Sequence, residues 1–427
     1  MARINQDAPS PARPRPPGTF ARLEEVARRV LISAGEASGD LYASSLVKAL
    51  RRREPNLDFF GCAGPRMQQA GVRPVVDSSS LAVVGLVEVV THIPRIYGEY
   101  RKLLAAARRE RPDVAILTDS PDFHLRLARG LKKLGIPVVY LVAPQVWAWR
   151  KGRLPRMRRT IDRLLCIFPF EVDFFKANGM DAAYIGHPLP GLIKPSASRH
   201  DLRKRHGIPD GTPLVALLPG SREGEAARHI PVLLETVELI RKSGRAPSPE
   251  FILAVPPGTV PDGSILRKRI SERSIKVLVG QTWDVLACAD LALAASGTVT
   301  IEAALLGTPM ITFYCVNSLT WWMGRHLVNV PFFSMVNLVA GRRVVPELIQ
   351  DEMTASNLAN EALALLGDES AIERMRQELR GVAQTLTGLD DPMEVAASIV
   401  ESYWEGAPHA ESGPEGTAVT SSSVVRA

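Results

Sequence analysis

Short apolar, β-branched runs alternate with longer amphipathic segments rich in Arg and Leu along most of this chain. Runs of this kind form the strands of a parallel sheet, and the amphipathic segments form the helices that connect them. After Pro346 we expect helices only, which either brace the second half or return to the first. The expected strands are 30–34, 57–62, 114–118, 138–142, 163–168 and 183–185 in the first half, and 214–218, 251–255, 276–279, 291–295 and 310–314 in the second.

The predicted strands divide about evenly around residues 186–191, a Gly- and Pro-rich segment typical of an interdomain linker. We therefore expect two doubly wound, Rossmann-like α/β domains, residues 23–190 and 191–400, facing each other across a cleft. Ligands bind such folds at the carboxyl ends of the strands. Residues 1–22 and 406–427 are polar and rich in Pro, Gly or Ser, and we expect them to be disordered tails.

Composition is that of a globular protein with two domains, since 46% of the 427 residues are hydrophobic and 23% are charged. The four cysteines are scattered without metal-ligand spacing, which predicts reduced thiols.

The net charge is +7, and residues 150–163 hold seven cations against one acid. Such a cluster can bind nucleic acid, anionic lipid or a phosphorylated substrate, or form a solvated helix face. No nucleic-acid-binding motif accompanies it, so we expect no nucleic acid partner.

Two glycine turns in the second half predict a site for a nucleoside diphosphate. Strand 214–218 ends in the sequence PGSR at 219–222, and strand 291–295 ends in SGT at 296–298. A buried strand that ends in glycine before a helix is a common way to hold phosphate, and an arginine adds a fixed cation. Phosphate is expected on the two turns, and ribose on the carboxylate that follows the second. The residues concerned are Ser221, Arg222, Ser296, Gly297, Thr298 and Glu302.

The first half offers a candidate general base. Asp119 comes directly after strand 114–118 and is better placed to face the cleft than Asp122 or His124. Asp122 fits a helix N-cap equally well, and His124 fits a helix face. Strand 30–34 leads into GEASGD at 35–40, which places Glu36, Ser38 and Asp40 at the same edge of the sheet. For Ser38 and Asp40 the alternative is capping of the helix that follows.

Three apolar segments suggest a greasy substrate or a membrane surface, although the first two, residues 81–90 and 144–150, also fit core packing. Residues 81–90 are almost uncharged and precede an Arg-rich amphipathic stretch, a combination suited to lipid contact. Residues 144–150 carry Trp147 and Trp149 on a predicted loop, where they can stack on a sugar or an acyl chain. Residues 321–326 begin with two further tryptophans. None of these segments is long enough to span a bilayer.

Nine short motifs, taken in chain order, resemble those of the lipid-A-disaccharide synthase family, and the resemblance covers residues 30–400. They are GEASGD at 35–40, GCAGPRM at 61–67, AVVGLVEVV at 82–90, DSPDF at 119–123, PQVWAWR at 144–150, IGHP at 185–188, LLPGSR at 217–222, SGTVTIE at 296–302 and NLVAGR at 337–342.

The resemblance implies a metal-independent, inverting glycosyltransferase of GT-B architecture, without a cofactor. It implies transfer of 2,3-diacylglucosamine from UDP-2,3-diacylglucosamine to 2,3-diacylglucosamine 1-phosphate, giving the β-1,6 disaccharide of lipid A and UDP. The enzyme would lie on the cytoplasmic face of the inner membrane as a peripheral protein, with a homodimer as a further expectation. Asp119 would be the base and Arg222 the cation at the diphosphate. Asn337 would contact donor, and Glu36 would orient acceptor or sugar.

The chain departs from the family pattern at two places, with His124 where asparagine is common and APQVWAWR where SPSVWAWR is common. Two other functions stay open. A UDP-N-acetylglucosamine 2-epimerase or a cell-wall glycosyltransferase on the same fold would share the phosphate turns and Glu302. A basic peripheral protein without catalysis would use the cationic cluster and would not need Asp119.

Overall fold

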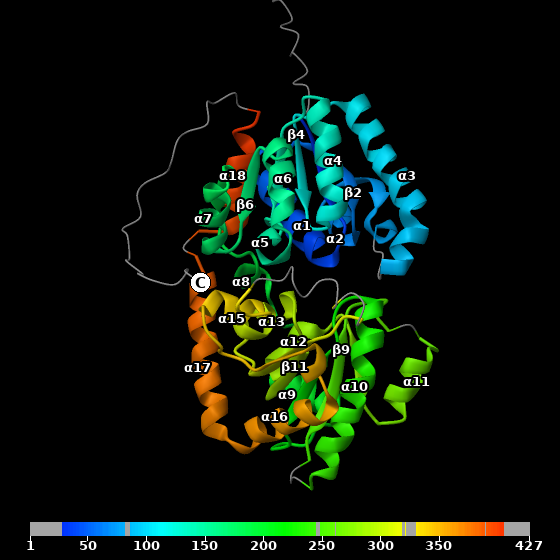
Figure 1. Ribbon diagram of the computed structural model, residues 1–427, viewed down its shortest axis with the longest axis vertical. Coiled ribbons are helices and arrows are strands. Elements are labelled where there is room, and N and C mark those ends of the chain that lie inside the picture. Colours follow the sequence, from blue (N-terminus) through cyan, green and yellow to red (C-terminus); the bar gives the residue numbers. More distant parts are fainter. Residues whose placement is uncertain are drawn as a thin grey trace, which may run out of the picture.

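Two parallel sheets, one in each half of the chain, organise the structure. The computed structural model describes residues 28–81, 86–244, 248–260, 262–317, 321, 330–388 and 390–404. Figure 1 shows the two α/β domains one above the other, with helices flanking each sheet. The predicted fold class, two doubly wound domains, is confirmed. Both predicted tails lie outside the described residues, as do residues 82–85 and 322–326 of the apolar segments.

The first domain holds a seven-stranded sheet in the order β3-β2-β1-β4-β5-β6-β7, and every pairing is parallel. Its central strands β1 and β4 are aliphatic and almost fully buried, as expected for strands covered on both faces. The strands are β1 (Arg29–Ala34), β2 (Asp58–Ala63), β3 (Arg73–Asp77), β4 (Val114–Thr118), β5 (Val138–Leu141), β6 (Arg163–Cys166) and β7 (Ala182–Tyr184).

Helices connect successive strands of this sheet and pack against it. Helix α3 is long and contains Pro94, and α4 follows β4 directly. The helices of this half, with two short 3₁₀ turns, are α1 (Ala37–Arg53), α2 (Pro65–Gln69), η1 (Ser78–Ser80), α3 (Leu86–Glu110), α4 (Pro121–Lys133), α5 (Val146–Trp149), η2 (Lys151–Arg153), α6 (Leu154–Thr160), α7 (Pro169–Ala177) and α8 (Leu189–Leu192). Within the described residues, no helix is both long and apolar enough to cross a bilayer.

The second domain repeats the arrangement with a six-stranded parallel sheet in the order β10-β9-β8-β11-β12-β13. The strands are β8 (Leu214–Leu218), β9 (Glu250–Val255), β10 (Lys276–Val279), β11 (Leu291–Ala295), β12 (Met310–Tyr314) and β13 (Glu347–Ile349). The helices are α9 (Arg199–Arg205), α10 (Glu223–Lys242), α11 (Ile265–Ser271), α12 (Thr282–Cys288), α13 (Thr298–Leu305), α15 (Met335–Ala340), η3 (Gln350–Glu352), α16 (Ala355–Gly367), α17 (Glu369–Leu386) and α18 (Pro392–Glu401).

All eleven predicted strands are present, but the prediction missed β3 and β13. Both are edge strands, so they pair on one side only and tolerate sequence that a central strand excludes. β3 contains Pro74 between polar ends, and β13 has only three residues. The expectation of helices only after Pro346 was therefore wrong for Glu347–Ile349, which pairs with β12.

The last described helix returns to the first domain. Figure 1 shows α17 running along the second domain and α18 lying against the first. Helix α18 packs on α1, burying Met393 and Val400, and its two glutamates pair with Arg52 and Arg53 at the end of α1. The sequence left open whether the terminal helices brace the second half or return to the first, and both occur. Helices α16 and α17 brace the second domain, and α18 packs on the first.

Candidate functional site

The predicted site residues lie at the point where each sheet reverses its strand order. In the first sheet the order reverses between β1 and β4, and in the second between β8 and β11. The chain leaves these four strands into the GEASGD turn, Asp119, the PGSR turn and the SGT turn. Such reversal points are where doubly wound folds bind their ligands, because the connections diverge to opposite faces and leave a crevice. Both reversal points therefore carry residues that the sequence marked.

Asp119 is held against the GEASGD turn by its own carboxylate. Oδ1 accepts a hydrogen bond from the Gly35 amide at 2.8 Å, and Oδ2 accepts one from the Glu36 amide at 3.0 Å. The approach depends on glycine, since a Cβ on Gly39 would lie 1.7 Å from Oδ2. A Cβ on Gly35 would lie 2.4 Å from Ser120 Oγ. The glycines of this motif thus serve close packing against Asp119, which the sequence did not predict.

The backbone of Asp119 is in a conformation that few non-glycine residues adopt. Its φ is 54° and that of Ser120 is 33°, both in the left-handed region. The Asp119 carbonyl accepts hydrogen bonds from His124 Nδ1 at 3.0 Å and from the hydroxyl of Tyr140. Both donors are fully buried. Strain of this kind persists only where surrounding contacts determine the conformation, and it is concentrated at functional sites.

Burial and a neighbouring charge raise the pKa of Asp119 to about 8. Burial is the larger cause and the Glu36 carboxylate the second, and together they outweigh the two amide hydrogen bonds that favour the ionised form. A carboxyl with a pKa in this range can both accept and release a proton near neutral pH, as a general base must. Burial lowers the pKa of His124 to about 4, so its ring is neutral.

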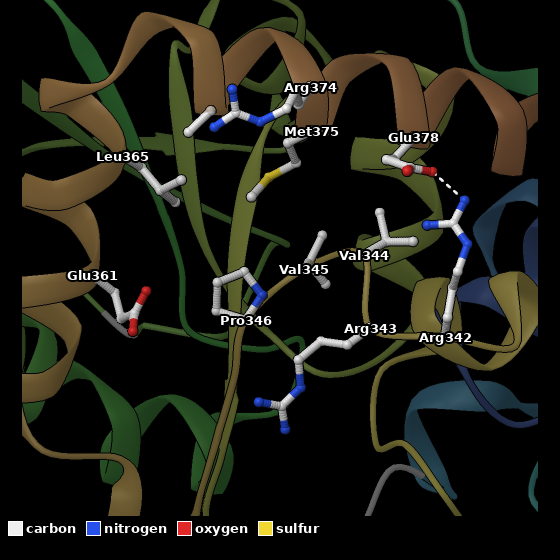
Figure 2. Close-up of a pocket in the computed structure, with 11 residues that line it drawn as sticks. Arg342, Arg343, Val344, Val345, Pro346, Glu361, Leu365, Arg374, Met375 and Glu378 are labelled. Carbon is white, nitrogen blue, oxygen red and sulfur yellow. Dashed lines mark hydrogen bonds and ion pairs between the residues drawn. The ribbon is translucent and has the colours of Figure 1, made fainter.

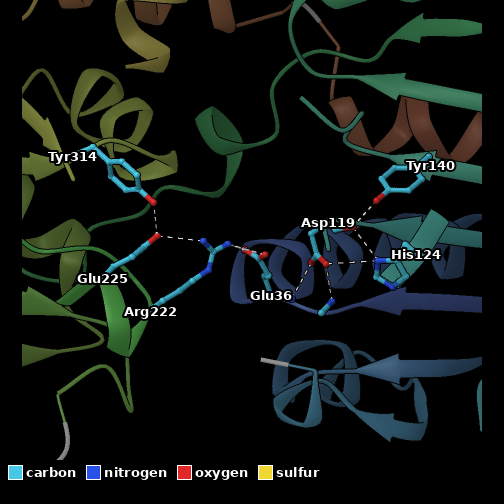
Figure 3. Close-up of polar contacts among 8 residues, drawn as sticks. Glu36, Asp119, His124, Tyr140, Arg222, Glu225 and Tyr314 are labelled. Carbon is cyan, nitrogen blue, oxygen red and sulfur yellow. Dashed lines mark hydrogen bonds and ion pairs between the residues drawn. The ribbon is translucent and has the colours of Figure 1, made fainter. Parts of the chain in front are cut away.

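Arg222 extends from the second domain to the first. Its Nη2 lies 2.8 Å from Glu36 Oε1 and 2.9 Å from Oε2, and its Nη1 lies 3.2 Å from Glu225 Oε1. Tyr314 donates a hydrogen bond to the same Glu225 oxygen at 3.0 Å. Figure 3 shows this chain of contacts crossing from one domain to the other, with Asp119 next to Glu36 on the side away from Arg222. The Arg222 side chain is 45% exposed, so the cation is accessible to a ligand.

The PGSR turn that carries Arg222 is fixed by its neighbours. Gly220 has a φ of 114°, which only glycine adopts readily. The exposed residue Ser221 is anchored through its carbonyl, which accepts a hydrogen bond from the buried Thr259 hydroxyl at 3.2 Å. Arg222 is then the N-cap residue of α10, at the positive end of the helix dipole. The turn thus presents a cation and a helix N-terminus together.

The SGT turn and Glu302 belong to α13. Ser296 Oγ donates to the carbonyl of Phe333 at 2.7 Å, so its hydroxyl holds the turn in place. Gly297 is the N-cap of α13 and Thr298 begins the helix, where the first amides have no intrahelical partner. Glu302 lies in the second turn of α13. Burial raises the pKa of Glu302 to about 7, while Trp283 and Arg66 act in the opposite direction.

Asn337 is placed differently from the expectation. Its side chain is fully buried, and its amide is taken up by the protein itself. Nδ2 donates to the Val345 carbonyl at 2.9 Å and to Glu347 Oε1 at 2.8 Å, while Oδ1 accepts from the amides of Val344 and Val345. In this conformation the side chain joins the NLVAGR segment to β13, which leaves the expected donor contact without support.

Two further acidic residues have structural partners. The Asp40 carboxylate accepts hydrogen bonds from the amides of Arg66 at 2.9 Å and Met67 at 3.0 Å. Asp40 therefore caps the N-terminus of α2. The sequence had left open a cleft-facing side chain or a cap of the helix that follows, and Asp40 does neither. Helix α1 begins before Asp40, at Ala37. Ser38 lies half-buried in the first turn of α1. Asp122 is 73% exposed and pairs with Arg150 and Arg153 at the edge of the cationic cluster.

Both tryptophans of residues 144–150 lie in the short helix α5 and not on the predicted loop, and one of the two rings packs in the core. Trp147 is buried, donates from Nε1 to Glu171 at 3.1 Å and packs edge-on against Phe170. The side chain of Trp149 lies outside the described residues. All four cysteines are free thiols, and three are buried.

Sequence reasoning missed four residues of this network, Glu225, Tyr140, His229 and Tyr314. Glu225 lies three residues after Arg222 on the predicted helix, a spacing at which opposite charges meet. Tyr140 and Tyr314 lie within apolar runs that indicated only core strands. His229 is fully buried and contacts the carbonyl of Pro219, a partner ten residues away that no local pattern indicates.

A separate cavity of about 390 Å³ lies in the second domain, between α16, α17 and the segment before β13. Figure 2 shows Val345, Pro346 and Met375 among its lining, with Arg342 paired to Glu378 at one side. None of the predicted site residues lines this cavity.

Comparisons with known proteins identify the family of this chain. The family model "Lipid-A-disaccharide synthetase" matches residues 30–393. The lipid-A-disaccharide synthase of Solibacter usitatus is 56% identical over 379 residues, covering 88% of this chain and 98% of the relative. That of Geobacter metallireducens is 43% identical over 376 residues, covering 88% and 97%.

Solved structures share the fold at low sequence identity. The UDP-GlcNAc 2-epimerase of Neisseria meningitidis, bound to UDP-GlcNAc, has a TM-score of 0.59 at 12% identity and covers 89% of this chain and all of its own. The calicheamicin glycosyltransferase has a TM-score of 0.53 at 15% identity, covering 89% and 99%. These likenesses show the GT-B-like fold alone. The family model and the sequence relatives together show that the chain belongs to the lipid-A-disaccharide synthase family.

Proposed function

We propose that this chain transfers 2,3-diacylglucosamine from UDP-2,3-diacylglucosamine to the 6-hydroxyl of 2,3-diacylglucosamine 1-phosphate. The products are the β-1,6 lipid A disaccharide 1-phosphate and UDP. The observation that carries the proposal is the pairing of the two reversal points. Asp119 in one domain and Arg222 in the other are separated by a single residue, Glu36, which contacts both through its amide and its carboxylate.

In the proposed reaction the acceptor oxygen attacks the donor anomeric carbon from the side opposite the diphosphate. A bond forms between this oxygen and the anomeric carbon as the bond from that carbon to the diphosphate oxygen breaks, which inverts the configuration. Asp119 takes the hydroxyl proton, and the bonding electrons leave with UDP. Arg222 and the N-terminal amides of α10 and α13 stabilise the charge that develops on the leaving diphosphate.

The remaining polar residues divide between the two substrates. Glu302 accepts hydrogen bonds from the ribose hydroxyls, and the amides of Gly297 and Thr298 hold phosphate beside the PGSR turn. The Ser296 hydroxyl keeps this turn attached to Phe333, so its part is to shape the site. Glu36 exchanges its contact with Arg222 for one with sugar or acceptor when the diphosphate arrives. Ser38 lies two residues after Glu36, in the first turn of α1 at the same edge of the sheet.

We also propose that the protein binds the cytoplasmic face of the inner membrane peripherally through α3. Ile93 is 50% exposed and Tyr97 is 60% exposed, one helical turn apart, with Arg95 between them in the sequence. Apolar side chains that insert beside cations that meet phosphate head groups are a known mode of interfacial binding. Acyl-chain contacts of residues 82–90 are proposed from the family resemblance, and all of these side chains lie outside the described ones. A homodimer is part of the proposal through the family resemblance alone.

The test is a radiolabelled assay that pairs the UDP-diacylglucosamine donor with the monosaccharide 1-phosphate in detergent micelles. A labelled lipid disaccharide with release of UDP supports the proposal. Conversion of water-soluble UDP-N-acetylglucosamine without a lipid acceptor would support the epimerase alternative, which the fold alone permits. Asp119→Asn separates the proposal from a protein that binds without catalysis, because the variant should lose turnover while UDP affinity changes little.

A further inference from the structure

Two buried histidines, one in each domain, hold the turns that carry Asp119 and Arg222. We propose that His124 and His229 are positioning residues, the first for the base and the second for the diphosphate cation. The proposal rests on the roles given above to Asp119 and Arg222. Each histidine lies in the helix that follows its turn and donates a hydrogen bond back to a main-chain carbonyl of that turn.

The contacts of His124 define its tautomer. The Asp119 carbonyl can only accept, so Nδ1, at 3.0 Å, carries the hydrogen. Nε2 then accepts from the hydroxyl of Ser33 at 2.8 Å. The ring is fully buried, and burial lowers its pKa to about 4, which agrees with a neutral imidazole. Both nitrogens therefore have partners, and the ring has one orientation.

This orientation matters because Asp119 adopts a left-handed backbone. At a φ of 54° the residue pays a conformational cost that surrounding contacts must offset. The His124 donor and the Tyr140 hydroxyl supply those contacts at the Asp119 carbonyl. If the Nδ1 donor is lost, the backbone can relax, and the carboxylate then moves away from the Gly35 and Glu36 amides.

His229 makes the equivalent contacts in the second domain. Nδ1 lies 2.7 Å from the Pro219 carbonyl, which can only accept, so Nδ1 donates. Nε2 lies 3.2 Å from the Cys315 carbonyl and 3.3 Å from the Cys315 amide, and in the neutral ring it accepts from that amide. The ring thereby joins the PGSR turn to the end of β12, and burial lowers its pKa. It also packs edge-on against Tyr314, whose hydroxyl holds Glu225 beside Arg222. Loss of the donor frees the turn at Pro219, three residues before the cation.

The experiment compares two amide substitutions at each histidine. Asparagine places its amide nitrogen near the position of Nδ1, whereas glutamine reaches toward Nε2, so only asparagine preserves the proposed donor. Turnover is measured with saturating substrates, and UDP affinity is measured by titration calorimetry. A displacement of about 1 Å in a reacting group can cost on the order of 100-fold in rate.

We expect His124→Gln to lower kcat at least about ten-fold with UDP affinity within about two-fold of wild type. We expect His229→Gln to weaken UDP binding at least about ten-fold and to lower kcat as well, because Arg222 serves both. The Asn variant at each position should recover most of the loss. At position 124, a residue that only fills the core would not divide kcat from UDP affinity in this way, since its loss lowers the folded fraction and both readouts together. At position 229 the recovery by asparagine makes this distinction, because Arg222 serves both readouts.

Three outcomes overturn the proposal: Gln variants that match wild type in kcat and UDP affinity, a His124→Gln variant that loses kcat and UDP affinity together, or folded Asn variants that recover nothing. Circular dichroism and thermal melts identify the folded variants, and the Asn variants decide the matter if the Gln variants do not fold. Asp119→Asn and Arg222→Ala are measured alongside. If those two leave turnover and UDP affinity unchanged, the failure belongs to the proposed roles of Asp119 and Arg222.

Discussion

At the scale of single residues, the chemistry of the site depends on how Asp119 is ionised. Its carboxylate accepts two backbone hydrogen bonds, which favour the charged form, yet burial and Glu36 raise its pKa to about 8. A base is active only when it is deprotonated, so the active fraction grows as the pH rises through this value.

We therefore expect kcat/KM to increase with pH, to reach half of its maximum near pH 8 and to level off about one pH unit above that value. The measurement is the pH–rate profile at substrate concentrations well below KM, which reports groups of the free enzyme. UDP affinity across the same range is the control, because it separates ionisation of the base from changes in donor binding. A midpoint near the ordinary aspartate pKa of about 4 would contradict the environment described for Asp119.

Arg222 carries a second prediction at this scale. A hydrogen bond to a charged partner contributes about 1.5–3 kcal/mol, so Arg222→Ala should weaken UDP binding roughly ten- to 100-fold and lower turnover as well. Arg269→Ala, which removes an exposed cation on α11, is the matched control and should leave UDP affinity unchanged. Calorimetric titration with UDP is the measurement, and equal affinity in Arg222→Ala and wild type would rule out the proposed contact.

At the scale of elements, the sequence predicted the central strands well because they are buried on both faces and must be apolar throughout. Edge strands β3 and β13 were not predicted, because each pairs on one side only and tolerates polar residues or proline. The site segments were found because they follow the central strands. Partners such as His229 and Tyr140 were missed because they reach those segments through tertiary contacts, which leave no periodic signal.

Asn337 likewise makes tertiary contacts that the sequence did not indicate, and these contacts give a third prediction. Its buried amide makes four hydrogen bonds that join the NLVAGR segment to β13. Asn337→Ala leaves these partners unsatisfied and should lower the free energy of unfolding by about 2–4 kcal/mol. The midpoint of thermal unfolding should fall by about 5–10 °C.

Asn357→Ala is the control for that change, since Asn357 is exposed at the start of α16 and its side chain makes a single hydrogen bond, to the Glu352 carbonyl. Its effect should stay under about 0.5 kcal/mol. If Asn337→Ala instead weakens donor binding without lowering the unfolding temperature, the contact expected from the family resemblance is the correct interpretation.

At the scale of the whole molecule, the two domains are connected in two places: through helix α18 and at the candidate site. Helix α18 returns to α1 through buried apolar residues and paired charges, while Glu36 and Arg222 connect the two reversal points directly. Exposed ion pairs contribute little to stability, so the contact between Glu36 and Arg222 matters mainly because it occupies the Arg222 guanidinium. It places a carboxylate on the cation that the diphosphate needs and a negative charge beside Asp119.

Glu36→Gln should therefore change two properties of the enzyme in a coupled way. Without the carboxylate, UDP no longer competes with Glu36 for Arg222, and its affinity should rise several-fold. The negative charge that raises the pKa of Asp119 is also removed, so the midpoint of the pH–rate profile should move below its wild-type value. Glu54→Gln, which removes a carboxylate from a surface pair with Arg28 in the same domain, should change neither property. Because the shift is read from the midpoint, it is measurable even if Glu36 also contacts substrate and the absolute rate falls. An unchanged midpoint together with unchanged UDP affinity would mean that the contact across the domains has no part in setting up the site.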